Sequence, residues 1–331
     1  MTGPAKPHGG RLPADDKREH MMVQVAKMHY DLERTQSEIA SELGLTRWQV
    51  SRLLSDSRAQ GIVRIEITPR SNRKAELEVQ LQQEFSLRDA IVVPMGDITD
   101  SDLLMESVAQ AAAKYLASIT PLPDLIGVSW GRTMSAVARF LPQNWNPGAH
   151  IVLVNGSTTL RQTSARTSAV AEEFAQTAGG TATLLPVPAI MGKKSTRDAL
   201  EQDPVIERVL AFAETAGLVC FGMGGLSHHS VLLNSGYLTE ADIDRLKSLG
   251  AVGDILGRFV DAEGRIVDPI LDDRTVGLRL DALARKARSI GVVAGQEKHE
   301  IAAAALRAKY VSVLITDEAT ARYVLEARHD Q

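Results

Sequence analysis

The chain has 331 residues, 44% of them hydrophobic, and a formal net charge of −4. These values fit a globular protein of two domains, and no apolar run approaches the roughly 18 residues that a membrane span requires. The single cysteine, Cys220, excludes an internal disulfide and is typical of a reducing compartment. Residues 1–17 are rich in glycine, proline and charge and lack the apolar segment of a signal peptide, so we expect a disordered tail on a cytoplasmic protein.

Residues 18–68 predict a small helical DNA-binding domain. Apolar residues in 17–32 have the spacing of one helix face, and residues 36–54 (QSEIASELGLTRWQVSRLL) predict two short helices joined by a tight turn. Gly44 permits the left-handed conformation that reverses the chain, and Thr46 is a suitable N-cap for the second helix. The polar and aromatic residues left on the outside suit phosphates and base edges. The predicted DNA contacts are Gln36, Thr46, Arg47, Trp48, Gln49, Ser51 and Arg52.

The alternative for this segment is an ordinary helical hairpin inside a larger core. Two observations favour DNA binding. Residues 61–67 alternate apolar and polar side chains, which predicts the strand that follows the second helix in a winged helix-turn-helix. Residues 44–74 carry seven basic and two acidic residues, a net charge of +5 that leaves −9 for the remainder. A basic module on an acidic body suits binding to a phosphate backbone.

Residues 69–88 predict a connector between two domains. The polar, turn-prone stretch 68–73 marks the boundary, and leucine and phenylalanine at four-residue intervals in 75–85 predict a short amphipathic helix. This helix either pairs with the same helix of a second copy or packs on its own domain. Both alternatives remain open at this point.

Residues 89–331 predict an effector domain of the open, doubly wound α/β class, because short apolar runs alternate with helical stretches. The predicted strands cover 90–93, 125–129, 151–154, 182–185, 218–221, 289–294 and 311–315. The predicted helices cover 103–118, 134–141, 168–178, 205–213, 240–249, 278–285, 299–308 and 318–327.

Three glycine-containing loops, 126–134, 154–157 and 220–225, each follow a predicted strand. In a parallel sheet such loops meet at one edge, where ligands bind, although a single glycine loop is more often only a tight turn. The first loop would place hydroxyls, backbone N–H groups and a guanidinium at a helix start, a combination typical of an anion site. The residues of these loops that we predict to line the pocket are Ser129, Gly131, Arg132, Thr133, Asn155, Gly156, Gly222 and Gly224.

Two charged residues complete the predicted pocket. Lys298 opens a helix after the strand 289–294 and is placed to reach a phosphate or sugar oxygen, unless it is an ordinary solvated lysine. Asp254, in the glycine-flanked segment 253–257, is a candidate acceptor for sugar hydroxyls. The adjacent pair His228 and His229 lacks a partner at metal-ligand spacing, so we predict neither a metal nor a cofactor.

The sequence resembles the SorC family of bacterial sugar-responsive transcriptional regulators, also called the sugar-binding DeoR-like group. The resemblance extends over about residues 21–327. It rests on QSEIASELGLTRWQVSRLLSDSRAQGIVRI, GVSWGRTMSAVA, VGDILGRFVDAEGRIVD and VVAGQEKHEIAAAALRAKYVSVLITDEATAR, in this order. Where the usual pattern before the lysine is Ala-Gly-Gly, this chain has Ala294, Gly295 and Gln296.

The resemblance implies a fold like that of ribose-phosphate isomerase and glucosamine-phosphate deaminase, a phosphorylated-sugar effector, and a homodimer or homotetramer. It places the phosphate near Gly131, Arg132, Thr133 and Lys298, and the sugar near Asn155, Gly156 and Asp254. Some members have a lysine or arginine where this chain has Asn155, which has no amine for a Schiff base. We therefore expect a regulator whose binding to double-stranded operator DNA is modulated by a sugar or sugar phosphate. The alternative is a sugar-phosphate isomerase or deaminase with an appended helical domain, which would need a paired general acid and base that the sequence does not indicate.

Overall fold

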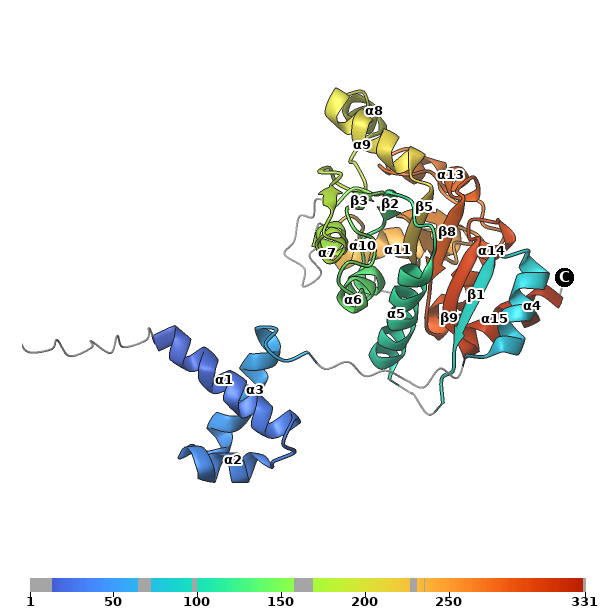
Figure 1. The fold of residues 1–331 in the computed structure, drawn as a ribbon. Coiled ribbons are helices and arrows are strands. Elements are labelled where there is room, and N and C mark those ends of the chain that lie inside the picture. Colours follow the sequence, from blue (N-terminus) through green and yellow to red (C-terminus); the bar gives the residue numbers. More distant parts are fainter. Residues whose placement is uncertain are drawn as a thin grey trace, which may run out of the picture. The chain divides into compact units, whose positions relative to one another are not determined.

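The computed structural model describes residues 14–64, 73–96, 100–157, 169–226, 231–234 and 236–329 (Figure 1). The chain forms two compact units, Met1–Arg70 and Ser71–Gln331. Within the described ranges, none of the helices combines the length and the apolar character that a bilayer crossing requires.

In the described part of the N-terminal unit there are three helices: α1 (Ala14–Tyr30), α2 (Gln36–Leu43) and α3 (Arg47–Ala59). The sequence predicted all three to within a few residues. Their small core consists of Val25, Met28, Ile39, Ala40, Val50 and Leu54. Gly44 ends α2 at a φ of 64°, which explains why glycine is used there. Of the predicted strand 61–67, residues 61–64 form a turn and bend instead, and the rest lies outside the described residues.

The larger unit is organised around a parallel sheet. Its strands are β1 (Asp89–Val93), β2 (Leu125–Val128), β3 (His150–Leu153), β4 (Thr181–Thr183), β5 (Leu218–Gly225), β8 (Arg288–Val292) and β9 (Val313–Asp317). Their spatial order is β1-β9-β8-β5-β2-β3-β4, and every pair along this path is parallel. The strand order reverses at β2 and β5, which is where an open α/β sheet forms its ligand site. The open α/β class and all seven predicted strands are confirmed.

Helices cover both faces of this sheet (Figure 1). One apolar core includes residues of α5 (Ser101–Ser118), α6 (Arg132–Phe140), α7 (Ala169–Ala178) and α11 (Glu240–Ser248). The other includes residues of α9 (Pro204–Thr215), α13 (Leu280–Ala284), α14 (His299–Arg307) and α15 (Glu318–His329). Cys220 is buried in the first core, as expected of a small hydrophobic side chain, and burial raises the pKa of its thiol to about 12.

The connector helix α4 (Ala75–Phe85) forms as predicted. Its residues Leu77 and Leu81 are buried in the second core, where the helix packs against β1 and α15. These are the contacts of a helix that packs on its own unit. Pairing between copies of this helix stays a prediction.

The sequence missed several short elements. No strand was predicted at residues 253–260, but β6 (Gly253–Ile255) and β7 (Arg258–Val260) form an antiparallel hairpin whose first strand pairs with β5. Also missed were three helices, α8 (Lys194–Glu201), α10 (Val231–Asn234) and α12 (Pro269–Asp272), and the 3-10 turn Gln296–Lys298. The hairpin matters most, because it carries Asp254.

Candidate functional site

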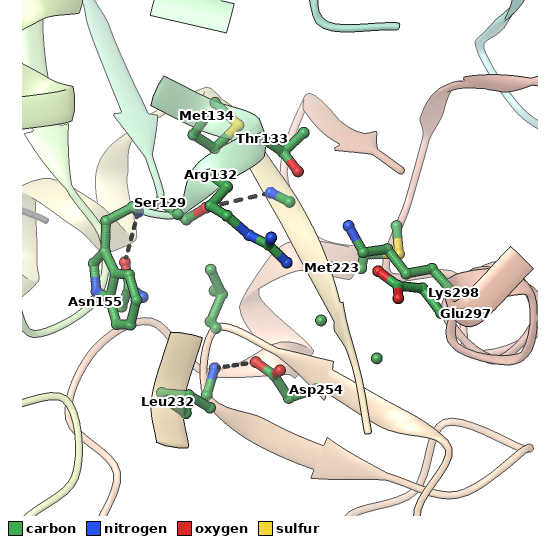
Figure 2. A pocket seen from close by; sticks show the side chains of 17 residues that line it. Ser129, Arg132, Thr133, Met134, Asn155, Met223, Leu232, Asp254, Glu297 and Lys298 are labelled. Atoms are coloured by element: carbon green, nitrogen blue, oxygen red, sulfur yellow. Dashed lines mark hydrogen bonds between the residues drawn. The ribbon is translucent and has the colours of Figure 1, made fainter. Parts of the chain in front are cut away.

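A cavity opens at the edge of the sheet where β2, β3, β5 and β8 end (Figure 2). The space between its walls, counted together with the open mouth, is about 730 Å³. Its lining consists of Ser129, Trp130, Gly131, Arg132, Thr133, Met134, Asn155, Gly222, Met223, Gly224, Gly225, Leu232, Asp254, Leu256, Gly257, Glu297 and Lys298. All the residues predicted for the effector pocket are therefore brought together, with the exception of Gly156.

The first wall is the turn between β2 and α6. Gly131 has a φ of 136°, a conformation that glycine adopts without strain, and it allows α6 to begin directly at Arg132. The Ser129 hydroxyl accepts a hydrogen bond from the Gly222 N–H at 3.3 Å, which ties this turn to β5. The first N–H groups of α6 have no partner within the helix, so this wall favours an anion.

The second wall is Asn155, which follows β3. The Trp130 N–H donates to Asn155 Oδ1 at 3.4 Å, and the backbone of Asn155 forms a bridge with Gly277. Gly156 lies behind this wall: its carbonyl accepts a hydrogen bond from Trp130 Nε1 at 2.7 Å. A Cβ atom on Gly156 would lie 2.5 Å from the Pro188 carbonyl oxygen, so glycine is required here for close packing.

The glycines of β5 allow two charged groups to approach the cavity. A Cβ atom on Gly224 would lie 2.1 Å from Asp254 Oδ1, and one on Gly225 would lie 2.5 Å from the Glu297 carbonyl oxygen. Without side chains at these positions, the β6–β7 hairpin and the turn at Gln296–Lys298 close against β5. Glycine therefore brings Asp254 and Lys298 to the same cavity.

The cavity has cationic groups and one partly buried carboxylate, that of Asp254. Figure 2 shows Arg132 extending toward the middle of the site, with Asp254 below it and Lys298 beside Glu297 to one side. Neither the Arg132 nor the Lys298 side chain has a hydrogen bond or ion pair with another described residue, so both are available to a ligand. Burial lowers the pKa of Lys298 despite the opposing effect of Glu297. Burial raises the pKa of Asp254 to about 6, although the Gly257 N–H (3.0 Å) and Lys298 both act to lower it.

The sequence did not predict the apolar part of the lining. It consists of Trp130, Met134, Met223, Leu232 and Leu256. Nothing distinguishes these residues from core positions in the sequence except that most of them lie next to predicted site residues. Among the described residues there is no group of three or more histidine, cysteine, aspartate or glutamate side chains that could hold a metal ion. His228 and His229 lie outside the described residues.

In the N-terminal unit, α3 and its N-cap carry all the predicted DNA contacts except Gln36. Thr46 caps the helix, and its backbone N–H donates to Gln49 Oε1 at 2.8 Å while the Gln49 N–H donates to the Thr46 hydroxyl at 3.2 Å. Arg47 and Ser51 are exposed, and Gln36, at the start of α2, is partly exposed. The capping box therefore uses one side of the Gln49 amide and leaves its NH₂ group available.

An exposed tryptophan is the most unusual feature of α3. Trp48 is 66% exposed, and the Arg52 guanidinium lies over its ring at 5.4 Å from the centroid. Residues four apart share one helix face, so this cation–π pair projects outward as one unit.

A helix-turn-helix unit joined to an α/β unit with an anion-favouring cavity defines a class of protein: a transcriptional regulator that responds to a small molecule. Residues 70–326 match the family described as "Putative sugar-binding domain". The chain is 30% identical over 308 residues to the deoxyribonucleoside regulator of Bacillus subtilis, covering 93% of this chain and 98% of the relative. It is 27% identical to the sorbitol operon regulator of Klebsiella pneumoniae, covering 95% and 99%.

Solved structures agree with these sequence matches. The full-length sorbitol operon regulator SorC from Klebsiella pneumoniae superposes with a TM-score of 0.70 at 28% identity, covering 93% of this chain and 98% of that one. A domain of a possible sugar-binding transcriptional regulator from Arthrobacter aurescens has a TM-score of 0.68 at 30% identity, covering 78% and 100%. The chain belongs to the SorC family of sugar-binding transcriptional regulators. It is a regulator rather than the enzyme considered as the alternative above.

Proposed function

We propose that the effector is a phosphorylated sugar and that it binds in the cavity at the sheet edge. The observation that carries this proposal is the separation of charge within one cavity. Arg132 and the start of α6 offer donors for a phosphate on one side, whereas Asp254 offers an acceptor for sugar hydroxyls on another. Lys298 is placed to contact the phosphate from the β8 side.

The chemistry of the relatives supports a sugar-derived effector. One of the two relatives above is named for a sorbitol operon and the other for deoxyribonucleosides. Polyols and deoxyribose derivatives share hydroxyl groups, and these match the acceptors Asp254 and Asn155. The cations Arg132 and Lys298, which pair with no other described residue, favour the phosphorylated over the free form, because a phosphate satisfies both charges at once.

In the same proposal, α3 enters the major groove of operator DNA, with Arg47 and Arg52 as the principal basic contacts. The regulator acts in the cytoplasm as a homodimer or homotetramer, so that two α3 helices bind two half-sites. The α/β unit sets how the DNA-binding units are presented, and the effector changes that arrangement.

A thermal-shift series tests the effector site. Pentose and hexose phosphates are compared with the corresponding free sugars and with inorganic phosphate on the full-length protein. A phosphorylated sugar should raise the melting temperature, because a ligand that binds only the folded state stabilises it. Arg132→Gln and Lys298→Met should each weaken binding of that ligand roughly tenfold to a hundredfold, the usual range for a lost charge-assisted hydrogen bond.

The matched control is Lys309→Met, which removes an exposed lysine just beyond the opposite end of α14. It should leave ligand binding unchanged. The proposal is wrong if free sugars and sugar phosphates stabilise the protein equally, or if Arg132→Gln and Lys298→Met bind like the control.

A further inference from the structure

The effector cavity and the point where the connector enters the α/β unit lie at the same edge of the sheet. β1 and β9 run parallel with Val93 opposite Asp317, so their carboxyl ends are adjacent. We propose that the corner formed by Asp317 and Glu318, at the start of α15, positions the connector according to whether the effector loop Gly295–Lys298 is occupied. This inference rests on the proposed function and assigns the route by which the effector cavity reaches the DNA-binding unit.

The first step joins the effector loop to Asp317. The Gly295 N–H donates to Asp317 Oδ2 at 2.9 Å, and the Lys298 N–H donates to the Gly295 carbonyl at 3.0 Å. Asp317 is fully buried and also accepts from Thr320, from its N–H at 2.9 Å and from its hydroxyl at 2.7 Å. One carboxylate therefore fixes both the loop that carries Lys298 and the first turn of α15.

A second contact joins the same two elements. The rings of His299 and Tyr323 stack with centroids 4.8 Å apart and an interplanar angle of 33°. His299 follows Lys298 directly, and Tyr323 lies in the second turn of α15. A change in the backbone at Lys298 can therefore reach α15 through two contacts, the hydrogen bond to Asp317 and the stacking of His299 on Tyr323.

The last step joins α15 to the connector. Glu318 Oε2 lies 3.3 Å from Lys74 Nζ, and Lys74 is the residue immediately before α4. The Lys74 N–H donates to the Val92 carbonyl at 3.3 Å, and Arg73 Nη2 donates to the Ala90 carbonyl at 3.2 Å. The connector thus enters the α/β unit attached to β1 by the Lys74 backbone and the Arg73 side chain, and to α15 by an ion pair.

The contacts along this route differ in strength, and the weakest is the ion pair between Lys74 and Glu318. The Asp317 contacts are buried, whereas Lys74 is 41% exposed and its ion pair with Glu318 is of the weak surface kind. Such a pair breaks and re-forms readily, so its population responds to small movements of α15. A phosphate that holds Lys298 should steady the loop, hence α15, and increase the fraction of time for which Lys74 is held.

Hydrogen exchange on the full-length protein tests the route, with inorganic phosphate as the probe and chloride at equal ionic strength as the reference. In the wild type, phosphate should slow exchange of the 295–298 amides. It should also slow exchange at residues 74–78, where the Glu78 N–H donates to the Lys74 carbonyl, by about fivefold, a typical size for coupling between sites. Lys74→Glu and Glu318→Lys should each keep the loop response and lose the connector response. The double charge reversal should regain it.

Arg322→Gln provides the matched control, because Arg322 also pairs with Glu318, at 2.8 Å, but both residues lie on α15. It should behave like the wild type. The inference is overturned if the loop responds and residues 74–78 do not, or if the connector response persists unchanged in Glu318→Lys. A loop that fails to respond at all would instead contradict the proposed phosphate site itself.

Discussion

At the scale of single residues, the ionised carboxylate of Asp254 lowers the stability of the folded protein. Burial raises the pKa of its carboxyl to about 6, well above the ordinary value of 3.8. The folded state therefore binds this proton more tightly than the unfolded state does. Stability contributed by Asp254 is lowest above about pH 6, where the carboxylate is ionised, and it rises as the pH falls towards the pKa of the unfolded state.

Asp254→Asn should consequently stabilise the ligand-free protein near neutral pH, by up to about 3 kcal/mol. The gain should shrink as the pH is lowered from about 7 to about 5, because protonation removes the same charge from the wild type. Urea unfolding across this pH range measures both effects. Equal stabilisation at every pH would mean that the side chain acts through packing and not through its charge.

The same substitution should weaken effector binding. Under the proposed function an ionised Asp254 accepts hydrogen bonds from sugar hydroxyls, so wild-type affinity should rise with pH through about 6. A phosphate group titrates in the same region, with its second pKa near about 6. Titration of the phosphate affects the wild type and Asp254→Asn equally. The difference between their affinities as a function of pH therefore gives the contribution of the Asp254 carboxyl alone.

The pair Trp48 and Arg52 yields a prediction about DNA binding. Stacking holds the Arg52 guanidinium against the Trp48 ring while leaving its N–H edges free for a base or phosphate. Trp48→Ala should weaken binding to the operator roughly fivefold through loss of this orientation, at an unchanged salt dependence, since no charge is removed. Arg52→Gln should lower both affinity and the salt slope.

Fluorescence anisotropy over a range of salt concentrations, with operator and unrelated DNA, separates these outcomes. Trp48→Phe keeps an aromatic ring beside Arg52 and should fall between the wild type and Trp48→Ala. If Trp48→Ala weakened operator and unrelated DNA by the same factor, the ring would not contribute to sequence selection.

Some site residues could be predicted from the sequence and others could not. Arg132 and Lys298 could be predicted because a cation close to a glycine turn after an apolar strand is typical of an anion site. Trp130 could not, because an apolar residue after a strand looks like a core residue. Gly156 was predicted to line the cavity because it lies in the same loop as Asn155. Its glycine is needed instead because the Pro188 carbonyl packs closely against it, away from the cavity.

At the scale of elements, the β6–β7 hairpin is held by one buried side chain. Arg258 is 3% exposed and pairs with Asp272 at 2.5 Å. It also donates to the carbonyls of Asp272, Leu278, Thr275 and Gly277. Since Gly277 forms the bridge with Asn155, Arg258 fixes two walls of the effector cavity relative to each other.

Arg258→Met should therefore destabilise the protein by about 3–5 kcal/mol, because it leaves Asp272 and several carbonyls without their partner. Denaturant unfolding gives the value. Arg265→Gln is the control: Arg265 follows the same hairpin, is 72% exposed and pairs at the surface, so it should change stability by less than about 1 kcal/mol. Similar losses in the two variants would contradict the role given to Arg258.

The β6–β7 hairpin is an element that could not be predicted from the sequence. Each of its strands has three residues, too few for an alternating pattern, and the first pairs only with the glycine end of β5 and with its hairpin partner. Its pairing with β5 depends on the absence of side chains at Gly224 and Gly225, which is a tertiary property. Six of the seven strands of the main sheet have four or more residues, so local pattern was enough to predict them. The seventh, β4, has three residues and was predicted from the longer run 182–185.

At the scale of the whole molecule, charge is divided unevenly along the chain. Residues 44–74 carry a net charge of +5, and the remainder carries −9. A single DNA-binding unit of this kind offers few basic contacts, and the acidic remainder repels the phosphate backbone. Under the proposed homo-oligomer, strong binding requires two α3 helices that act on the same DNA molecule.

The dependence on a second DNA-binding unit can be measured by dividing the operator. A duplex that retains one half-site should bind the full-length protein at least about a hundredfold more weakly than the intact palindrome, because the second contact is made at a high effective concentration. Inserting about five base pairs between the half-sites turns one of them to the opposite side of the duplex and should have a similar effect. A duplex of the same length and composition with both half-sites scrambled gives the non-specific reference. If the single half-site bound as tightly as the palindrome, one α3 helix would suffice, and the effector would have to act on that unit directly and not on the arrangement of a pair.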